Sequence, residues 1–199
     1  METTRFSGGS LVAMTTTETR DRVLEHATEL FHREGFRAVG VDRLASAAGI
    51  SKKTLYQLFP SKDDVLVAAL EASREMAVAD LPDEHDDRSV RQRLVAVFEA
   101  QRAYASRPEF SGCFFVNVAT ELRDPAHAAV EVAHLQKSEL TKYVRRQAEV
   151  AGIEDSAFLA EQLTVLHTGA ADYALLTGSY PLSVFVAVAT LLDASGIPE

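Results

Sequence analysis

The sequence predicts an all-α protein: an N-terminal three-helix unit containing a helix-turn-helix, followed by a six-helix unit. Apolar residues recur at helical spacing, Gly or Pro follows most of these segments, and no segment alternates with a period of two over a strand length. We expect residues 1–14 to be disordered, residues 15–61 to form the first domain and residues 62–199 the second.

The first helix has a start signal and a stop signal. Thr15 and Glu18 have the spacing of a capping box, in which each side chain satisfies the other residue's amide. Gly35 can end the helix. The apolar stripe between these signals is Val23, Ala27, Leu30 and Phe31.

The helix-turn-helix is predicted over Val41–Phe59. Gly49 permits a sharp turn, and Ser51 can cap the second short helix. The side chains expected on the buried side are Leu44, Ala45, Ala48, Leu55 and Leu58. The side chains expected on the exposed side of the second helix are Lys52, Lys53, Thr54, Tyr56 and Gln57. These groups suit phosphates and base edges, although spacing alone also fits a purely structural helical hairpin.

The amino-acid sequence of this region resembles that of the DNA-binding domain of the TetR family of transcriptional regulators. The matching segments are Gly35–Phe36, Val41–Ser51 and Thr54–Leu66. The sequence departs from the family pattern at Gly40, where a Thr often caps the helix and touches phosphate. It also departs at Lys53, where Gly is common, and at Leu58, where an aromatic residue or His is common.

The resemblance implies a homodimeric regulator without a cofactor, most simply a repressor released from a palindromic operator by a small-molecule effector. We expect the lysines and Tyr56 to contact phosphates, Arg43 to add a backbone contact, and Thr54 and Gln57 to face base edges. The full set of candidate DNA-binding residues is Arg43, Ser51, Lys52, Lys53, Thr54, Tyr56, Gln57 and Lys62.

Six helices follow in the second unit. Ser61 and Asp64 can form a capping box, and Asp124–Pro125, Ser156 and Pro181 are further start signals. The expected helices cover residues 62–79, 89–106, 109–122, 124–151, 156–176 and 181–194. The helix at 109–122 is apolar on all sides and should be central. The acidic segment 81–88 is expected to be a solvated linker.

Charge is unevenly distributed. The formal net charge is −9, but residues 19–66 carry +1 and residues 67–199 carry −9. Any attraction to DNA must therefore come from the local field of the helix-turn-helix rather than from total charge.

The sequence favours a cytoplasmic protein. One cysteine, Cys113, excludes an intramolecular disulfide, and no apolar run near the N-terminus is long enough for a secretory signal. Residues 173–192 carry no charge, but Gly178–Pro181 interrupts them, so we expect two helices and not a membrane span.

The last two helices are rich in apolar and small residues, and in the TetR family the corresponding pair forms a four-helix dimer interface. The candidate interface residues are Leu159, Leu163, Leu166, Ala170, Phe185, Val188 and Leu192. An intramolecular core would use the same residues.

The resemblance also places an effector pocket among the middle helices. The candidate residues combine aromatic side chains with a few polar groups: Tyr104, Phe110, Phe114, Asn117, Glu121, His134, His167 and Tyr173. Ordinary core packing would use the same aromatic residues.

Two other functions are alternatives. An all-α enzyme lacks support because no metalloprotease, nucleophile-elbow or phosphate-loop motif is present. A metal-sensing or redox-sensing regulator would use the histidines or Cys113. His127 and His134 are about 10.5 Å apart along a helix and cannot share one ion, and Cys113 precedes two Phe, which favours a buried thiol. We expect no metal site.

Overall fold

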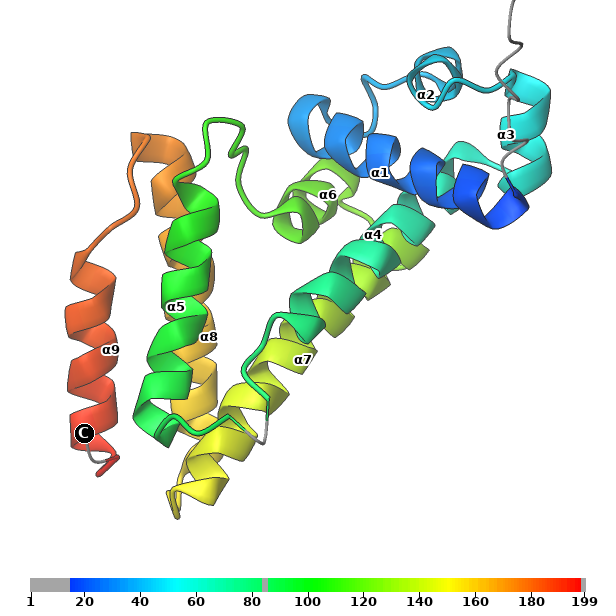
Figure 1. The fold of residues 1–199 in the computed structure, drawn as a ribbon. Helices are drawn as coiled ribbons and strands as arrows, with labels where there is room; N and C mark the ends of the chain where they lie inside the picture. The colour runs from blue at the N-terminus through cyan, green and yellow to red at the C-terminus, as the bar shows by residue number, and fades with distance from the viewer. Residues whose placement is uncertain (1–14, 84–85, 198–199) are drawn as a thin grey trace, which may run out of the picture.

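The computed structural model describes residues 15–83 and 86–197, and these residues form nine α-helices and no strand, as predicted. The predicted disorder of residues 1–14 concerns residues outside this range. The helices, labelled in Figure 1, are α1 (Thr16–Glu34), α2 (Val41–Ala47), α3 (Lys52–Leu58), α4 (Lys62–Ala79), α5 (Val90–Ala105), α6 (Phe114–Leu122), α7 (Ala128–Val150), α8 (Ser156–Thr177) and α9 (Ser183–Ala194).

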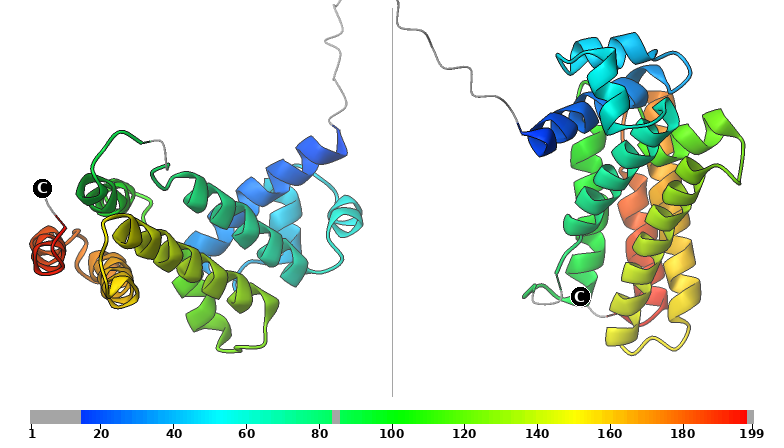
Figure 2. Two further views of the ribbon diagram at one scale, coloured as in Figure 1. Left: turned by 90° about the horizontal axis from the view of Figure 1, so that it is seen from below. Right: turned by 90° about the vertical axis from the view of Figure 1, so that its right-hand side faces the viewer.

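The helices form two groups joined by α4, α6 and α7. α1, α2 and α3 lie at one end of the molecule, and α5, α8 and α9 stand side by side at the other (Figures 1 and 2). α4 and α6 both pack along the long α7, and α7 also packs along α8. The helix-turn-helix therefore sits on a scaffold that continues into the larger unit.

Two apolar cores follow this arrangement, but the boundary between them does not fall at residue 61. The first core contains the buried side chains of α1 to α3 together with Val65–Leu70 of α4, Phe114 and Phe115 of α6, and the start of α7. The second core joins α5, the end of α7, α8 and α9. The division into domains at residue 61 stays a prediction.

Local signals located the early helices correctly. The Glu18 amide donates to Thr15 Oγ1 at 3.2 Å and the Thr15 amide donates to the Glu18 carboxylate at 2.7 Å, which is the predicted capping box. Gly35 ends α1 with φ of 85°. Ser61 caps α4 by accepting the Asp64 amide at 3.1 Å.

α6 differs from its prediction in length and in character. It begins at Phe114 and not at Glu109, because Gly112 has φ of 93° and a side chain there would meet Leu175 at 2.8 Å. The helix is also amphipathic. Its buried side chains are Phe114, Phe115 and Val118, and the rest of the helix is half-buried or exposed.

α7 begins later than predicted. The Asp124–Pro125 pair was the expected start, but the Asp124 carboxylate accepts the Ala126 amide at 3.0 Å and closes a turn. His127 is the actual N-cap, because its Nδ1 accepts the Ala129 amide at 3.1 Å. A histidine cap was not foreseeable from the usual preference for Ser, Thr, Asp and Asn.

The last two helices begin close to their predicted positions with different caps. Ser156 is the first residue of α8 and not its cap, and Asp155 stands at the N-cap without a side-chain hydrogen bond. α9 begins at Ser183, two residues beyond Pro181. Gly178 has φ of 73° and separates the two helices, so the uncharged stretch is interrupted as predicted. No helix in the described part of the chain is long and apolar enough to cross a membrane.

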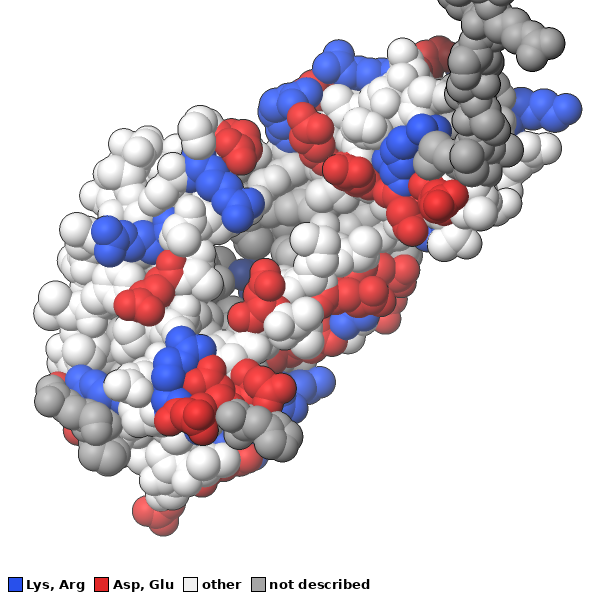
Figure 3. All heavy atoms as spheres, in the orientation of Figure 1, with Lys and Arg blue, Asp and Glu red and all other residues white. Residues whose placement is uncertain are grey.

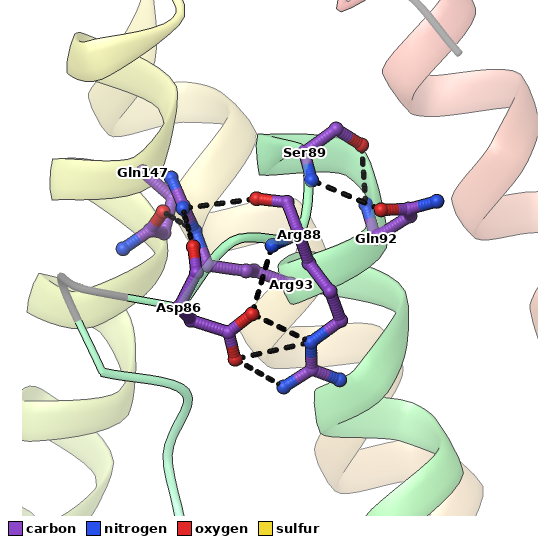
Figure 4. Close-up of polar contacts among 6 residues, drawn as sticks. All are labelled: Asp86, Arg88, Ser89, Gln92, Arg93 and Gln147. Carbon is purple, nitrogen blue, oxygen red and sulfur yellow. Dashed lines mark hydrogen bonds and ion pairs between the residues drawn. The ribbon is translucent and has the colours of Figure 1, made fainter.

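The segment before α5 is more structured than a solvated linker. Arg93 donates to the carbonyls of Asp86 and Arg88, both at 3.0 Å, and its Nε donates to Gln147 of α7 at 2.8 Å (Figure 4). Asp86 pairs with Arg88, which lowers the pKa of the Asp86 carboxyl to about 2. Arg93 therefore ties this segment to α7, and the Asp86 carboxylate is used in a local pair with Arg88.

The first core predicts a stability difference between two leucines. Leu66 is fully buried, whereas Leu135 on α7 is 46% exposed. We expect Leu66→Ala to lower the free energy of unfolding by about 2–5 kcal/mol because it leaves a cavity. Leu135→Ala should change it by no more than about 0.5 kcal/mol. Urea denaturation at one protein concentration measures both, and equal losses would contradict this assignment of the core.

Candidate nucleic-acid interface

The turn between α2 and α3 has the geometry of a helix-turn-helix. Gly49, with φ of 63°, reverses the chain just after α2. The Ile50 amide then donates to the Ala45 carbonyl at 2.9 Å and closes the end of α2. Ser51 Oγ accepts the Thr54 amide at 3.0 Å, so α3 begins where it was predicted to begin.

The two sides of α3 differ sharply in chemistry. Leu55 is buried against the first core, and Phe59 just beyond the helix is buried beside it. The opposite side exposes Lys52, Lys53 and Gln57, together with Tyr56, which is 49% exposed. No acidic residue lies on α3. The exposed side is therefore a polar surface with two cations.

The two lysines of α3 are not equivalent. Lys52 Nζ lies 2.8 Å from the Asp42 carboxylate of α2, and this hydrogen bond and charge raise the pKa of Lys52. Lys53 has no ion-pair partner among the described residues. A phosphate could pair with Lys53 directly, but it would have to replace Asp42 at Lys52. That exchange is inexpensive because exposed pairs contribute little.

Other candidate contacts also have partners within the protein. Arg43 Nη2 lies 2.7 Å from Glu34, which also pairs with Arg33. The hydroxyls of Ser51 and Thr54 lie 2.8 Å apart and share a hydrogen bond. Thr54 can still reorient toward a base edge, whereas Ser51 is needed as the cap of α3.

Lys62, a predicted phosphate contact, already has partners within the protein. Its Nζ donates to the carbonyls of Phe36 at 2.9 Å and Val39 at 3.2 Å, and it lies 4.0 Å from the centre of the Phe36 ring. The ammonium is thus engaged in holding the α1–α2 loop, contrary to the expectation that it is free for a phosphate. The partners are more than twenty residues away in the sequence, so no local pattern revealed them.

Comparison with known proteins agrees with this geometry. Residues 23–69 match the model for bacterial regulatory proteins of the tetR family. A solved TetR transcriptional regulator from Streptomyces avermitilis is 40% identical, with a TM-score of 0.82 over 90% of this chain and 99% of that one. The chain belongs to the TetR family.

Two curated regulators are also similar to this TetR-family protein. The HTH-type transcriptional regulator YjdC of Escherichia coli is 24% identical over 80% of this chain and 85% of its own. The HTH-type transcriptional repressor BdcR of the same organism is 30% identical over 62% of this chain and 63% of its own. The protein is therefore a helix-turn-helix transcriptional regulator and not an enzyme. Members of the family bind operator DNA, usually as dimers, and respond to small-molecule effectors.

In this TetR-family protein Glu121 joins the helix-turn-helix to the larger unit. Its carboxylate, on α6, accepts the backbone amides of Phe36 at 2.9 Å and Arg37 at 2.7 Å. Gly35 packs against the same carboxylate, which lies 3.1 Å from where a Cβ would be. Glu121 was predicted to line an effector pocket; its carboxylate binds the α1–α2 loop, and the residue also lines a surface hollow at this place.

His32 forms a second link at this junction. Its Nε2 donates to the Gly112 carbonyl at 2.9 Å, and Ser111 Oγ donates to the His32 carbonyl at 3.2 Å. Burial lowers the pKa of His32, although the hydrogen bond to Gly112 opposes this effect. Sequence reasoning did not single out His32, because a lone histidine near the end of a helix gives no signal of its own.

The structure does not bring the eight predicted pocket residues together. Tyr104 and Phe114 lie beside His32, with ring centres 6.5 and 5.3 Å from its ring, and Phe110 packs against Tyr104. Asn117 and Glu121 lie at the junction with the α1–α2 loop. His134 is exposed on α7, beside a separate hollow lined by α6 and α7. Tyr173 is 52% exposed on α8.

His167 belongs to a polar network beside the second core. Gln101 donates to His167 Nδ1 at 3.0 Å and to its carbonyl at 2.8 Å, and Tyr180 donates to Gln101 at 2.9 Å. Burial, with a smaller contribution from the charge of Lys137, lowers the pKa of His167 to about 3. The imidazole is therefore neutral at physiological pH and acts as a hydrogen-bonding group.

The predicted dimer residues mostly face the protein's own core. Leu159, Leu163, Ala170, Val188 and Leu192 are buried within the chain, and Leu166 and Phe185 are half-buried. Different side chains of the same two helices are exposed: Phe158, Val165, Tyr173, Leu175, Leu176, Leu182 and Val186. Helical periodicity identified α8 and α9 as apolar, and most of the candidate side chains are used in the chain's own core, which was the alternative reading of the sequence.

The alternatives based on metal or thiol chemistry gain no structural support. Within residues 15–83 and 86–197, no three His, Cys, Asp or Glu side chains come together as a metal ion would require. Cys113 is half-buried and stands at the N-cap of α6, so it is less enclosed than predicted.

The hydrogen bonds from the α1–α2 loop to Glu121 predict a measurable effect of this side chain on the loop. In Glu121→Ala the amides of Phe36 and Arg37 lose an ionised acceptor, which is worth about 1.5–3 kcal/mol per bond. Their hydrogen exchange, followed by NMR, should accelerate at least about tenfold.

Glu131→Ala is the matched control, because Glu131 is exposed on α7 and contacts neither amide. Unchanged exchange at both amides in Glu121→Ala would show that the link is not formed in solution.

Proposed function

We propose that this regulator binds a palindromic operator as a homodimer and acts as a repressor that a small-molecule effector releases. The observation that carries the proposal is the polar side of α3, exposed and free of acidic residues on a protein that is acidic overall. Residues 15–61 would serve as the DNA-binding domain and residues 62–199 as the effector-binding and dimerisation domain, and such a protein works in the cytoplasm.

Within this proposal the side chains of α3 have distinct tasks. Lys53 and Tyr56 contact phosphates, and Lys52 does so after releasing Asp42. Thr54 and Gln57 face the base edges, where a glutamine amide can pair with adenine through two hydrogen bonds. Arg43, at the start of α2, adds a backbone contact in exchange for its pair with Glu34.

The repressor mode is supported by the similarity to BdcR, which is named a repressor. A place for an effector is suggested by the hollow between α5 and α4 that Figure 3 shows on the surface of the molecule. The aromatic cluster around His32 and the neutral imidazole of His167 offer apolar surface and hydrogen-bonding groups of the kind that ligand pockets use.

Operator binding can be tested by comparing substitutions of Lys53 and Lys62. We expect Lys53→Ala to weaken binding of DNA from upstream of the protein's own gene. The slope of log affinity against log salt should fall by about 0.9, because one phosphate contact is lost. Fluorescence anisotropy across a salt series measures both quantities.

Lys62→Met is the control, since Lys62 holds the α1–α2 loop. It should lower the stability of the protein and leave the salt slope unchanged. The assignment of α3 as the recognition helix fails if Lys53→Ala matches the wild type in affinity and slope.

Dimerisation through α8 and α9 is supported by their exposed apolar side chains. Val165 and Val186 are 65% and 69% exposed, and Leu176 is 84% exposed. Leaving this much apolar surface in water is unfavourable, and an isologous contact would bury it in both copies. Two recognition helices presented by one dimer could then read half-sites about 34–36 Å apart.

A charge placed on this surface should separate the copies. We expect Val165→Asp to be monomeric at concentrations where the wild type is dimeric, because dimerisation would bury an unpaired carboxylate. Sedimentation equilibrium measures the mass. Val150→Asp is the control, since Val150 is 71% exposed but belongs to the end of α7 and not to α8 or α9. A dimeric Val165→Asp variant would exclude this surface as the interface.

A further inference from the structure

A surface hollow lies where the α1–α2 loop meets the end of α6. Its volume is about 570 Å³, and the residues that line it are Arg37, Asn117, Thr120, Glu121 and Arg123. Arg37 comes from the DNA-binding unit and the other four come from α6 and the residue that follows it. A second hollow, which α6 and α7 line, shares only Thr120 with this one.

Two guanidinium groups of this hollow form no ion pair with a described residue. Arg37 and Arg123 are both exposed, and neither has a carboxylate within ion-pair distance among the described residues. Six other arginines of the chain do pair with carboxylates: Arg33, Arg43, Arg74, Arg88, Arg91 and Arg145. The guanidinium is well suited to bind carboxylate and phosphate groups, because its donors can form two parallel hydrogen bonds to them.

Glu121, the one acidic residue that lines the hollow, already accepts hydrogen bonds from the protein backbone. Glu121 accepts the amides of Phe36 and Arg37 through its two carboxylate oxygens. Its charge is thus directed at the backbone of the loop, and neither Arg37 nor Arg123 forms an ion pair with it. With two cations and one acid the lining carries a net positive charge, so it favours an anion.

Arg123 is held in place by the backbone at the end of α6. It adopts φ of 54°, and it is the one non-glycine residue of the described ranges with positive φ. Its Nε donates to the Thr120 carbonyl at 3.2 Å, and its outer guanidinium nitrogens have no partner among residues 15–83 and 86–197. Such a conformation is uncommon for arginine, and uncommon backbone conformations concentrate at functional sites.

We propose that this hollow binds a small organic anion whose phosphate or carboxylate groups bridge Arg37 and Arg123. The volume exceeds what a lone inorganic ion needs and lies within the range of ligand sites. Thr120 and Asn117 line the same space and offer polar atoms to the rest of the molecule. Because one arginine belongs to the α1–α2 loop and the other to the end of α6, the bound anion fastens these two parts together. It would act in addition to any effector between α5 and α4.

Binding can be tested without DNA by isothermal titration calorimetry of the full chain. The probes are citrate for a carboxylate ligand and glycerol 3-phosphate for a phosphate ligand, with sodium chloride at matched ionic strength as the reference. We expect saturable binding of at least one probe, one per chain. Arg37→Gln and Arg123→Gln should each weaken it about tenfold or more.

Arg102→Gln is the matched control, because Arg102 is exposed on α5 and has no acidic partner among the described residues. It should bind as the wild type does. Circular dichroism of each variant establishes that the helices are intact. The proposal is overturned if neither probe binds saturably, if sodium chloride reproduces the heat, or if Arg102→Gln loses as much affinity as the two test variants.

A second measurement addresses the consequence of binding. The bound probe should change operator affinity in the wild type and leave it unchanged in Arg123→Gln. If the anion binds as expected but the protein binds no operator at all, the proposed function fails while the anion site stands. If the operator binds but no anion does, only the anion site fails.

Discussion

The short segment between α1 and α2 is the constraint on which the arrangement of this protein depends. On one side Lys62, at the start of α4, donates to the Phe36 and Val39 carbonyls. On the other side Glu121, at the end of α6, accepts hydrogen bonds from the Phe36 and Arg37 amides. Backbone donors and acceptors of the same few residues are therefore satisfied by two charged side chains from different helices, which fixes where α2 and α3 stand.

This arrangement explains how the larger unit can influence the DNA-binding unit. The first core runs without a break from α1 through α4 and α6 into the start of α7, so the helix-turn-helix is not a separately packed body. A shift of α6 would be felt directly at the α1–α2 loop through Glu121 and at α1 through His32. In the proposed function, an effector would act on DNA binding through its different affinity for two such arrangements, and α6, which contacts both units, would be the helix that differs between them.

The sequence predicted the parts of the fold that depend on local chemistry. The capping box at Thr15, the turn at Gly49 and the cap at Ser51 involve residues within a few positions of one another, and they were located correctly. α6 was predicted too long because the local apolar pattern did not show that Gly112 takes a positive φ against Leu175 of α8. The identity of the fold thus followed from one short region.

The candidate sites were harder to predict because their partners are distant in the sequence. Lys62 looked like a free cation and Glu121 like a pocket acid, but each meets backbone atoms of the α1–α2 loop, 23 to 85 residues away. Helical spacing likewise marked α8 as apolar without showing that Leu163 points inward and Val165 outward. Which side of an apolar helix is covered depends on its neighbours, and that information is not local.

The most direct test of this account is the operator affinity of Glu121→Ala, measured beside the wild type across a salt series. Glu121 offers no cation to a phosphate, so the salt slope should stay the same. The affinity itself should fall, because a helix-turn-helix released from α6 must be ordered when DNA binds. Weaker binding with an unchanged slope would support the α1–α2 loop as the link between the two units. An affinity equal to that of the wild type would contradict it.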